Sequence, residues 1–146
     1  AYICEIASWA KDNGKSLNDI LEEIYDTYGL FKEKLYTIKM DGIKGSNKIN
    51  DIMEKYRIAP PLTIFGDKVK EVVDYNKEVK NPIINVKSNV IQLISEKNYS
   101  ITLRPSGTEP KIKFYFSLSD DNSEENKNKL SNLINKEILN IKNNYE

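Results

Sequence analysis

The strongest candidates for a ligand-binding site lie in one short segment of the chain, residues 104–113. The segment reads Arg104-Pro-Ser-Gly-Thr-Glu-Pro-Lys-Ile-Lys113. An arginine guanidinium can bind two oxygens of a phosphate monoester, hydroxyls and backbone N–H groups can bind the remaining oxygens, and a lysine adds positive charge. Proline fixes φ and glycine permits a positive φ, so these residues also fit a tight turn whose amides converge on an anion. The segment is therefore a candidate phosphate-binding loop.

The strands expected on either side determine where the charged side chains of this loop point. Apolar and polar residues alternate over residues 99–104 and again over residues 111–118. Arg104 and Lys113 both fall on the polar side of that alternation, so they project from the same face of a sheet. Three basic side chains against one carboxylate give the segment a local charge of +2, although the whole chain has a net charge of zero.

An ordinary hairpin turn is the alternative to a phosphate-binding loop at this position. Proline, serine, glycine and threonine are common in turns that bind no ligand. The chemistry of the segment alone leaves both interpretations open.

The composition of the 146-residue chain excludes several other kinds of site. The chain has no histidine, so it can build neither a Ser-His-Asp nor a Cys-His nucleophile system, and no His-ligated zinc site. Its single cysteine, Cys4, allows no internal disulfide. Zero net charge and only two arginines argue against nucleic acid or an anionic membrane as a partner. We predict no catalytic residue and no metal-ligand set in this chain, and a cytoplasmic location.

The first 35 residues carry the pattern of two amphipathic helices. Apolar residues recur at helical spacing, Ser16 stands where it can cap the second helix, and Gly29 follows the end of that helix. Two such helices cannot bury their apolar faces against each other alone. This part of the chain is therefore expected to need a neighbour.

Residues 36–146 predict a different arrangement, in the order strand, helix, four strands, helix. The strands are expected at residues 36–40, 68–75, 89–95, 99–104 and 111–118, with a polar surface loop over residues 76–88. Ser46 is expected to cap the first helix of this part. Mostly sequential strands favour an antiparallel sheet. The predicted fold class is α+β, with a four- to five-stranded, mainly antiparallel sheet, helices on one face, and a helical hairpin in front.

The eight residues Arg104-Pro-Ser-Gly-Thr-Glu-Pro-Lys111, followed by an aromatic strand, closely resemble the phosphate-binding signature of the alpha-D-phosphohexomutases. The resemblance covers the whole chain. Residues 1–35 look like the helical end of the third domain of that family, and residues 36–146 look like its C-terminal phosphate-binding domain, which has a TATA-box-binding-protein-like fold. Within the family the chain is most similar to the bacterial phosphoglucomutase branch. Because it also lacks an initiator methionine, we expect it to be a C-terminal fragment.

The resemblance implies an isomerase that interconverts sugar 1-phosphates and 6-phosphates by intramolecular phosphotransfer through a phosphoserine. In this family the fourth domain binds the phosphate that is not being transferred and rotates to close the active site. Carried over residue by residue, the implied phosphate-binding residues are Arg104, Ser106, Gly107, Thr108 and Lys113. The residues that match the signature and shape the loop are Pro105, Glu109 and Pro110.

The resemblance also implies the partners of this chain. They are a phosphosugar (glucose or mannose 1- or 6-phosphate, with the bisphosphate intermediate) and the other domains of the same enzyme. The chain carries no Asp-rich metal loop, so no cofactor is expected in it, and Mg²⁺ is implied only for the full-length enzyme. The alternatives are a phosphopentomutase or phosphoglucosamine mutase fragment, or a free-standing anion-binding interaction module.

We predict that the purified 146-residue chain has no mutase activity and binds phosphosugars only weakly. Three or four charge-assisted hydrogen bonds of about 1.5–3 kcal/mol each are largely offset by ordering and desolvation. A coupled assay with glucose 1-phosphate checks the first statement, and measurable turnover would refute it.

Overall fold

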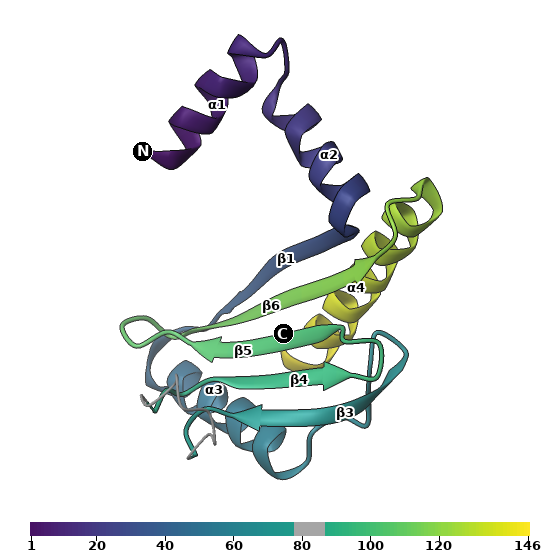
Figure 1. Cartoon of the computed structure of the whole chain (residues 1–146). Coiled ribbons are helices and arrows are strands. Elements are labelled where there is room, and N and C mark those ends of the chain that lie inside the picture. The colour runs from purple at the N-terminus through teal and green to yellow at the C-terminus, as the bar shows by residue number, and fades with distance from the viewer. Residues whose placement is uncertain (78–86) are drawn as a thin grey trace.

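The computed structural model describes residues 1–77 and 87–146 of the chain (Figure 1). In chain order the elements are α1 (Tyr2–Asp12), α2 (Leu17–Tyr28), β1 (Leu30–Lys39), α3 (Gly42–Ile58), β2 (Thr63–Ile64), β3 (Asp67–Asp74), β4 (Ile91–Ser95), β5 (Ser100–Pro105), β6 (Lys111–Asp120) and α4 (Glu124–Tyr145). Most of the polar loop expected over residues 76–88 lies outside the described residues.

The described residues form a sheet of six strands in the order β1-β6-β5-β4-β3-β2, and every neighbouring pair is antiparallel. Helices α3 and α4 lie on one face, and in Figure 1 no helix of the described residues lies on the other face. The α+β fold class with helices on one face of an antiparallel sheet is thereby confirmed. The strand that the sequence did not predict is β2, because two residues are too short to show an alternating pattern.

The core lies between the sheet and the two helices on that face. In β6 every second side chain is buried, and Ile112, Phe114, Phe116 and Leu118 all point toward the helices. The rings of Tyr56 on α3 and Phe114 make an edge-to-face contact, with centroids 6.5 Å apart. Burial of each large apolar side chain contributes about 1.5–3 kcal/mol, so this alternation sets both the register and the orientation of β6.

Strand β1 begins at Leu30, well before the start expected at residue 36. Only Leu30 and Ile38 are fully buried along it, so the apolar alternation is weak in its first half. The strand forms nevertheless because it pairs with β6 along its whole length, from Leu30 opposite Asp120 to Lys39 opposite Lys111. That pairing partner lies far away in the sequence and leaves no local signal.

The first helix after β1 also begins earlier than expected. Helix α3 starts at Gly42, and Ser46 lies inside it, where its hydroxyl donates a 3.4 Å hydrogen bond to the Gly42 carbonyl. The prediction that Ser46 caps this helix is therefore wrong. Serine in a helix can bond to the carbonyl four residues earlier as well as cap an end, and the sequence alone does not separate the two roles.

The helical hairpin before β1 agrees with the sequence. The Ser16 hydroxyl accepts from the Asp19 N–H at 3.2 Å, and the Asp19 carboxylate accepts from the Ser16 N–H at 2.7 Å, which completes a capping box. These hydrogen bonds lower the pKa of Asp19. Helix α2 ends at Tyr28, and the C-cap residue Gly29 has a φ of 91°, in the region that favours glycine. The large apolar and aromatic side chains exposed along the hairpin are Tyr2, Ile3, Ile6, Trp9, Leu17, Leu21, Ile24 and Tyr28.

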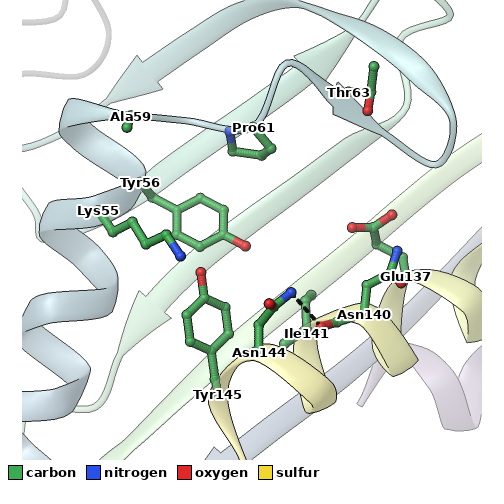
Figure 2. A pocket seen from close by; sticks show the side chains of 10 residues that line it. All are labelled: Lys55, Tyr56, Ala59, Pro61, Thr63, Glu137, Asn140, Ile141, Asn144 and Tyr145. Carbon is green, nitrogen blue, oxygen red and sulfur yellow. Dashed lines mark hydrogen bonds between the residues drawn. The ribbon is translucent and has the colours of Figure 1, made fainter.

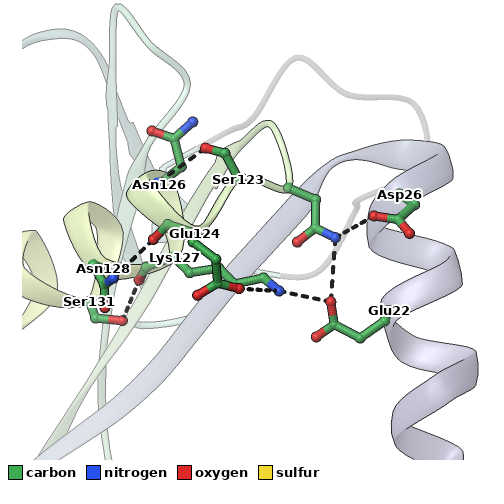
Figure 3. A network of polar contacts seen from close by, with 9 residues as sticks. Glu22, Asp26, Ser123, Glu124, Asn126, Lys127, Asn128 and Ser131 are labelled. Atoms are coloured by element: carbon green, nitrogen blue, oxygen red, sulfur yellow. Dashed lines mark hydrogen bonds and ion pairs between the residues drawn. The ribbon is translucent and has the colours of Figure 1, made fainter.

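Polar contacts join α2 to the start of α4 (Figure 3). The Lys127 ammonium lies 2.8 Å from the Glu22 carboxylate and 3.1 Å from the Glu124 carboxylate. The Asn122 amide donates to Asp26 at 2.6 Å. The hydrogen bond from Lys127 lowers the pKa of Glu22. Together these contacts and Gly29 set how the hairpin leaves the sheet.

A strained turn between β2 and β3 is held by a side chain of α4. Phe65 has a φ of 54°, which is unfavourable for a residue with a large side chain. Its N–H donates to the Glu137 carboxylate at 3.1 Å, and its ring contacts Tyr99 and Phe116 edge to face. Glu137 also lines a hollow of about 310 Å³ between the ends of α3 and α4 (Figure 2). Burial raises the pKa of Glu137 above its ordinary value.

The Glu137→Gln variant is expected to be more stable than the wild-type chain at pH 7. Because the pKa of Glu137 is higher in the folded state than the ordinary value of 4.5, the folded state binds more protons, and stability falls as pH rises through that window. Glutamine cannot ionise but can still accept from the Phe65 N–H. Urea unfolding from pH 4 to pH 8 measures the difference.

The stability advantage of Glu137→Gln should shrink toward pH 4, where Glu137 is largely protonated in the unfolded as well as the folded state. The exposed substitution Glu5→Gln is the matched control and should leave the pH dependence of stability unchanged. A Glu137→Gln variant that is less stable than wild type at pH 7 would contradict this account.

Candidate functional site

The site predicted from the sequence lies at one end of the sheet, where the loop of residues 106–110 joins β5 to β6. Figure 1 shows this loop extending past the ends of the strands. In the β5–β6 register, Arg104 lies directly opposite Lys113, and Pro105 lies opposite Ile112. Because Ile112 is fully buried on the helix face, Arg104 and Lys113 both project from the open face. The structure thus brings together the two cations that the sequence placed on one side.

Two like charges directly opposite each other on neighbouring strands destabilise a sheet. Within residues 1–77 and 87–146, no carboxylate lies within ion-pair distance of Arg104 or Lys113. Arg104 is exposed and Lys113 is half-buried. This pair of adjacent basic side chains is called the cation pair below. An anion bound between them would relieve their repulsion.

A further basic side chain, Lys39, joins this end of the sheet and was missed from the sequence. Lys39 is the last residue of β1, and it lies opposite Lys111, while Thr37 lies opposite Lys113. With Lys39 included, four basic side chains and the carboxylate of Glu109 give this end a local charge of +3, against the +2 counted along the segment. The pairing of β1 with β6 is a long-range contact, so only the sheet order could have revealed Lys39.

Glu109 and Lys111 form an ion pair within the loop, at 2.6 Å. The hydrogen bond from Lys111 and the positive charges of Lys111, Lys39 and Lys113 lower the pKa of Glu109. Lys111 is therefore already paired, and the charge available to a ligand comes from the other three basic side chains.

The backbone of the loop differs in part from the expected anion-binding turn. The N–H of Ser106 donates to the Lys111 carbonyl at 2.8 Å, so it is not directed at a ligand. Gly107 does not have a positive φ, so the conformational freedom of glycine is not used there. A Cβ at Gly107 would meet no other atom of the described residues within 4 Å, so these residues leave the backbone open to close approach. Gly107 and Thr108 are both exposed at the tip of the loop.

The proline residues hold the ends of the loop. Pro105 is the last residue of β5, and the carbonyl of Pro110 accepts from the Met40 N–H at 2.8 Å. This hydrogen bond ties the loop to the segment between β1 and α3. The loop is thus anchored at both ends, with Ser106 half-buried and the tip exposed.

The other arginine of the chain serves a structural purpose. Arg57 at the end of α3 donates to Asp74 at 3.2 Å and to Glu54 at 2.7 Å, and it also bonds Asn89. The Arg57 and Asp74 side chains are 13% and 11% exposed. Of the two arginines, only Arg104 is left without a carboxylate partner among the described residues.

The described residues show neither a metal site nor a membrane span. No group of three or more Asp, Glu, Cys or His side chains within them could hold a metal ion. No helix among them combines the length and the apolar character that crossing a bilayer requires. The residues present therefore do not fit the Mg²⁺ implied for the full-length enzyme.

The chain is similar in sequence to bacterial phosphoglucomutases. It is 41% identical to phosphoglucomutase from Staphylococcus aureus strain RF122 over 140 residues, which cover 90% of this chain and 25% of that protein. The protein of strain MRSA252 is 43% identical over 124 residues, covering 80% of this chain and 22% of its own length. The chain therefore spans about a quarter of the length of these curated relatives.

The fold is also similar to that of a solved phosphoglucomutase. Parafusin from Paramecium, crystallised in its open form, superimposes with a TM-score of 0.53 and 20% identity, over 84% of this chain and 22% of that one. At this identity the likeness concerns the fold alone. No protein-family model matches the chain. The matches to the Staphylococcus enzymes confirm the predicted resemblance, and the chain fits a C-terminal part of a phosphoglucomutase.

Proposed function

We propose that this chain is the phosphate-binding part of a phosphoglucomutase-type isomerase. The chain binds the phosphate group that is not being transferred, at the far end of the phosphosugar, and helps to close the active site. The chain supplies no catalytic residue and no metal ligand in the proposal, and the phosphoserine and Mg²⁺ belong to other parts of the enzyme. The observation that carries the proposal is the cation pair of Arg104 and Lys113, two like charges side by side on an open face.

A dianionic phosphate matches the groups that this end of the sheet presents. The Arg104 guanidinium can donate two parallel hydrogen bonds to phosphate oxygens, and Lys113 and Lys39 add positive charge on the same face. The Thr108 hydroxyl and the exposed amides at the tip of the loop can reach further oxygens. Ser106 contributes its hydroxyl rather than its N–H, because the Lys111 carbonyl already accepts from that N–H.

Holding the distal phosphate has a clear chemical use in an isomerase of this class. A bisphosphorylated sugar must turn end for end between two transfer steps, and a site that binds either phosphate keeps the intermediate in place. Fixed positioning lowers the entropic cost of the second transfer. Closure over the sugar also keeps water from the phosphorylated nucleophile.

The helical hairpin provides the connection to the rest of the enzyme in this proposal. We assign residues 1–35 to the end of the third domain and residues 36–146 to the phosphate-binding domain, and β1 runs through that boundary. The exposed apolar side chains of α1 and α2 then meet the remainder of the third domain. The polar contacts between α2 and the start of α4 lie on the path between the two parts.

The proposed role can be tested in a chimera with a curated relative. The chain replaces the matching part of the Staphylococcus aureus phosphoglucomutase, to which it is 41% identical. In this chimera, Arg104→Ala is expected to raise the KM for glucose 1-phosphate by about 10- to 100-fold, because it removes one or two charge-assisted hydrogen bonds. A smaller fall in kcat is expected from slower closure.

Lys97→Ala is the matched control for the loss of one positive charge. Lys97 lies in the turn between β4 and β5, at the opposite end of β5 from the cation pair. This variant should retain the kinetic constants of the chimera. Unchanged kinetics in Arg104→Ala, or an equal effect of Lys97→Ala, would defeat the proposal.

A further inference from the structure

A hollow of about 500 Å³ lies on the open face of the sheet, immediately beside the cation pair. Its walls come from four neighbouring strands and include Glu33, Leu35, Gln92, Thr102, Tyr115 and Ser117. In the strand register, Leu35, Tyr115, Thr102 and Gln92 form one row across β1, β6, β5 and β4. The preceding row contains Thr37, Lys113 and Arg104. The two rows are two residues apart, which is about 6.6–6.8 Å along the strands.

The side chains of this hollow are rich in hydroxyl groups. Ser100, Thr102, Tyr115 and Ser117 all line it, and no hydrogen bond joins their hydroxyls to another residue in the described part of the chain. All four residues are half-buried, and their hydroxyls are not among the buried polar atoms without a partner, so they remain open to a ligand. Each hydroxyl can both donate and accept, as binding of a polyhydroxylated molecule requires.

Other groups in the hollow complement a sugar ring in different ways. Glu33 is exposed at the far end, where its two carboxylate oxygens can accept from neighbouring hydroxyls of one ligand. The Tyr115 ring and the half-exposed Leu35 side chain offer apolar surface to the C–H face of a ring. The Gln92 carboxamide is oriented by Tyr75, whose hydroxyl donates to its oxygen at 3.0 Å. Most ligand sites combine apolar surface with a few placed polar groups in this way.

We propose that this hollow is a sugar subsite that holds the hexose ring of a phosphosugar whose phosphate lies at the cation pair. The inference rests on the proposed function and extends it from the phosphate to the sugar. Arg104 and Lys113 favour a ligand with an anionic group. The hydroxyl-lined hollow, two residues further along the strands, favours a ligand with several hydroxyl groups. A phosphorylated hexose carries both features, with the ring directly next to the phosphate. Thr102 and Tyr115, which face both the ring and the cation pair, are the positioning residues of this subsite.

Amide chemical shifts of the 146-residue chain test the subsite, with inorganic phosphate and glucose 6-phosphate as probes at matched ionic strength. Inorganic phosphate is expected to shift only amides of residues 104–113. Glucose 6-phosphate is expected to shift these and also amides of residues 33–35, 100–102 and 115–117. It should bind more tightly than inorganic phosphate, because the ring adds contacts that phosphate lacks.

Two variants separate the sugar contacts from the phosphate contacts. Thr102→Val and Tyr115→Phe each remove one hydroxyl with little change of shape, and each is expected to weaken glucose 6-phosphate binding by about 2- to 10-fold. Their affinity for inorganic phosphate should stay as in the wild-type chain. Thr63→Val, on the helix-covered side of the sheet, is the matched control and should change neither affinity.

The outcomes distinguish the two levels of the proposal. If glucose 6-phosphate shifts only residues 104–113 and binds no better than phosphate, the sugar subsite is wrong and the phosphate-binding role stands. If Thr102→Val and Tyr115→Phe weaken both ligands equally, the subsite is likewise overturned. If neither ligand shifts residues 104–113, both the proposed function and the subsite fail.

Discussion

The register of β6 between β1 and β5 determines which side chains are buried under the helices and which basic side chains meet on the open face. Alternate residues of β6 are buried under α3 and α4, and a slip by one residue would turn Phe114 and Phe116 out to solvent. The same register places Lys113 between Thr37 of β1 and Arg104 of β5. The large apolar side chains on the covered face therefore hold the basic side chains together on the open face.

The two arginines of the chain lie in different electrostatic surroundings. Arg104 and Lys113 are adjacent like charges with no carboxylate partner among the described residues, so their repulsion is expected to lower the stability of the free protein. The apolar core beneath them holds the strands together against that repulsion. Arg57 shows the contrast, because it is enclosed by acidic and amide partners and stabilises the packing of α3 on β3. Arg57 thus stabilises the fold, whereas Arg104 has no carboxylate partner among the described residues. The net charge of zero does not show this difference.

Local patterns predicted the parts of the fold that local forces determine. The alternation in residues 111–118 gave the correct faces of β6, and Ser16 with Asp19 gave the correct cap of α2. The early start of β1 and the position of Lys39 depend on pairing with a strand far away in sequence, and no local pattern contains that information. The conformation of the 106–110 loop could not be predicted from residue type either. A glycine at position 107 suggests a positive φ, but Gly107 does not have one. The hollow beside the cation pair is contributed by four strands, so it also required the sheet order.

If the cation pair binds an anion, its repulsion should cost stability in the free protein and the anion should restore that stability. The most direct measurement is the unfolding free energy of the wild-type chain and of Lys113→Thr, with and without inorganic phosphate. Without phosphate, Lys113→Thr should be about 0.2–1 kcal/mol more stable than wild type, because the repulsion with Arg104 is removed. Phosphate should then stabilise the wild-type chain according to its occupancy and stabilise the variant less, because one of the cations that bind it is missing. A variant that is less stable without phosphate, and that phosphate stabilises as much as wild type, would contradict this account.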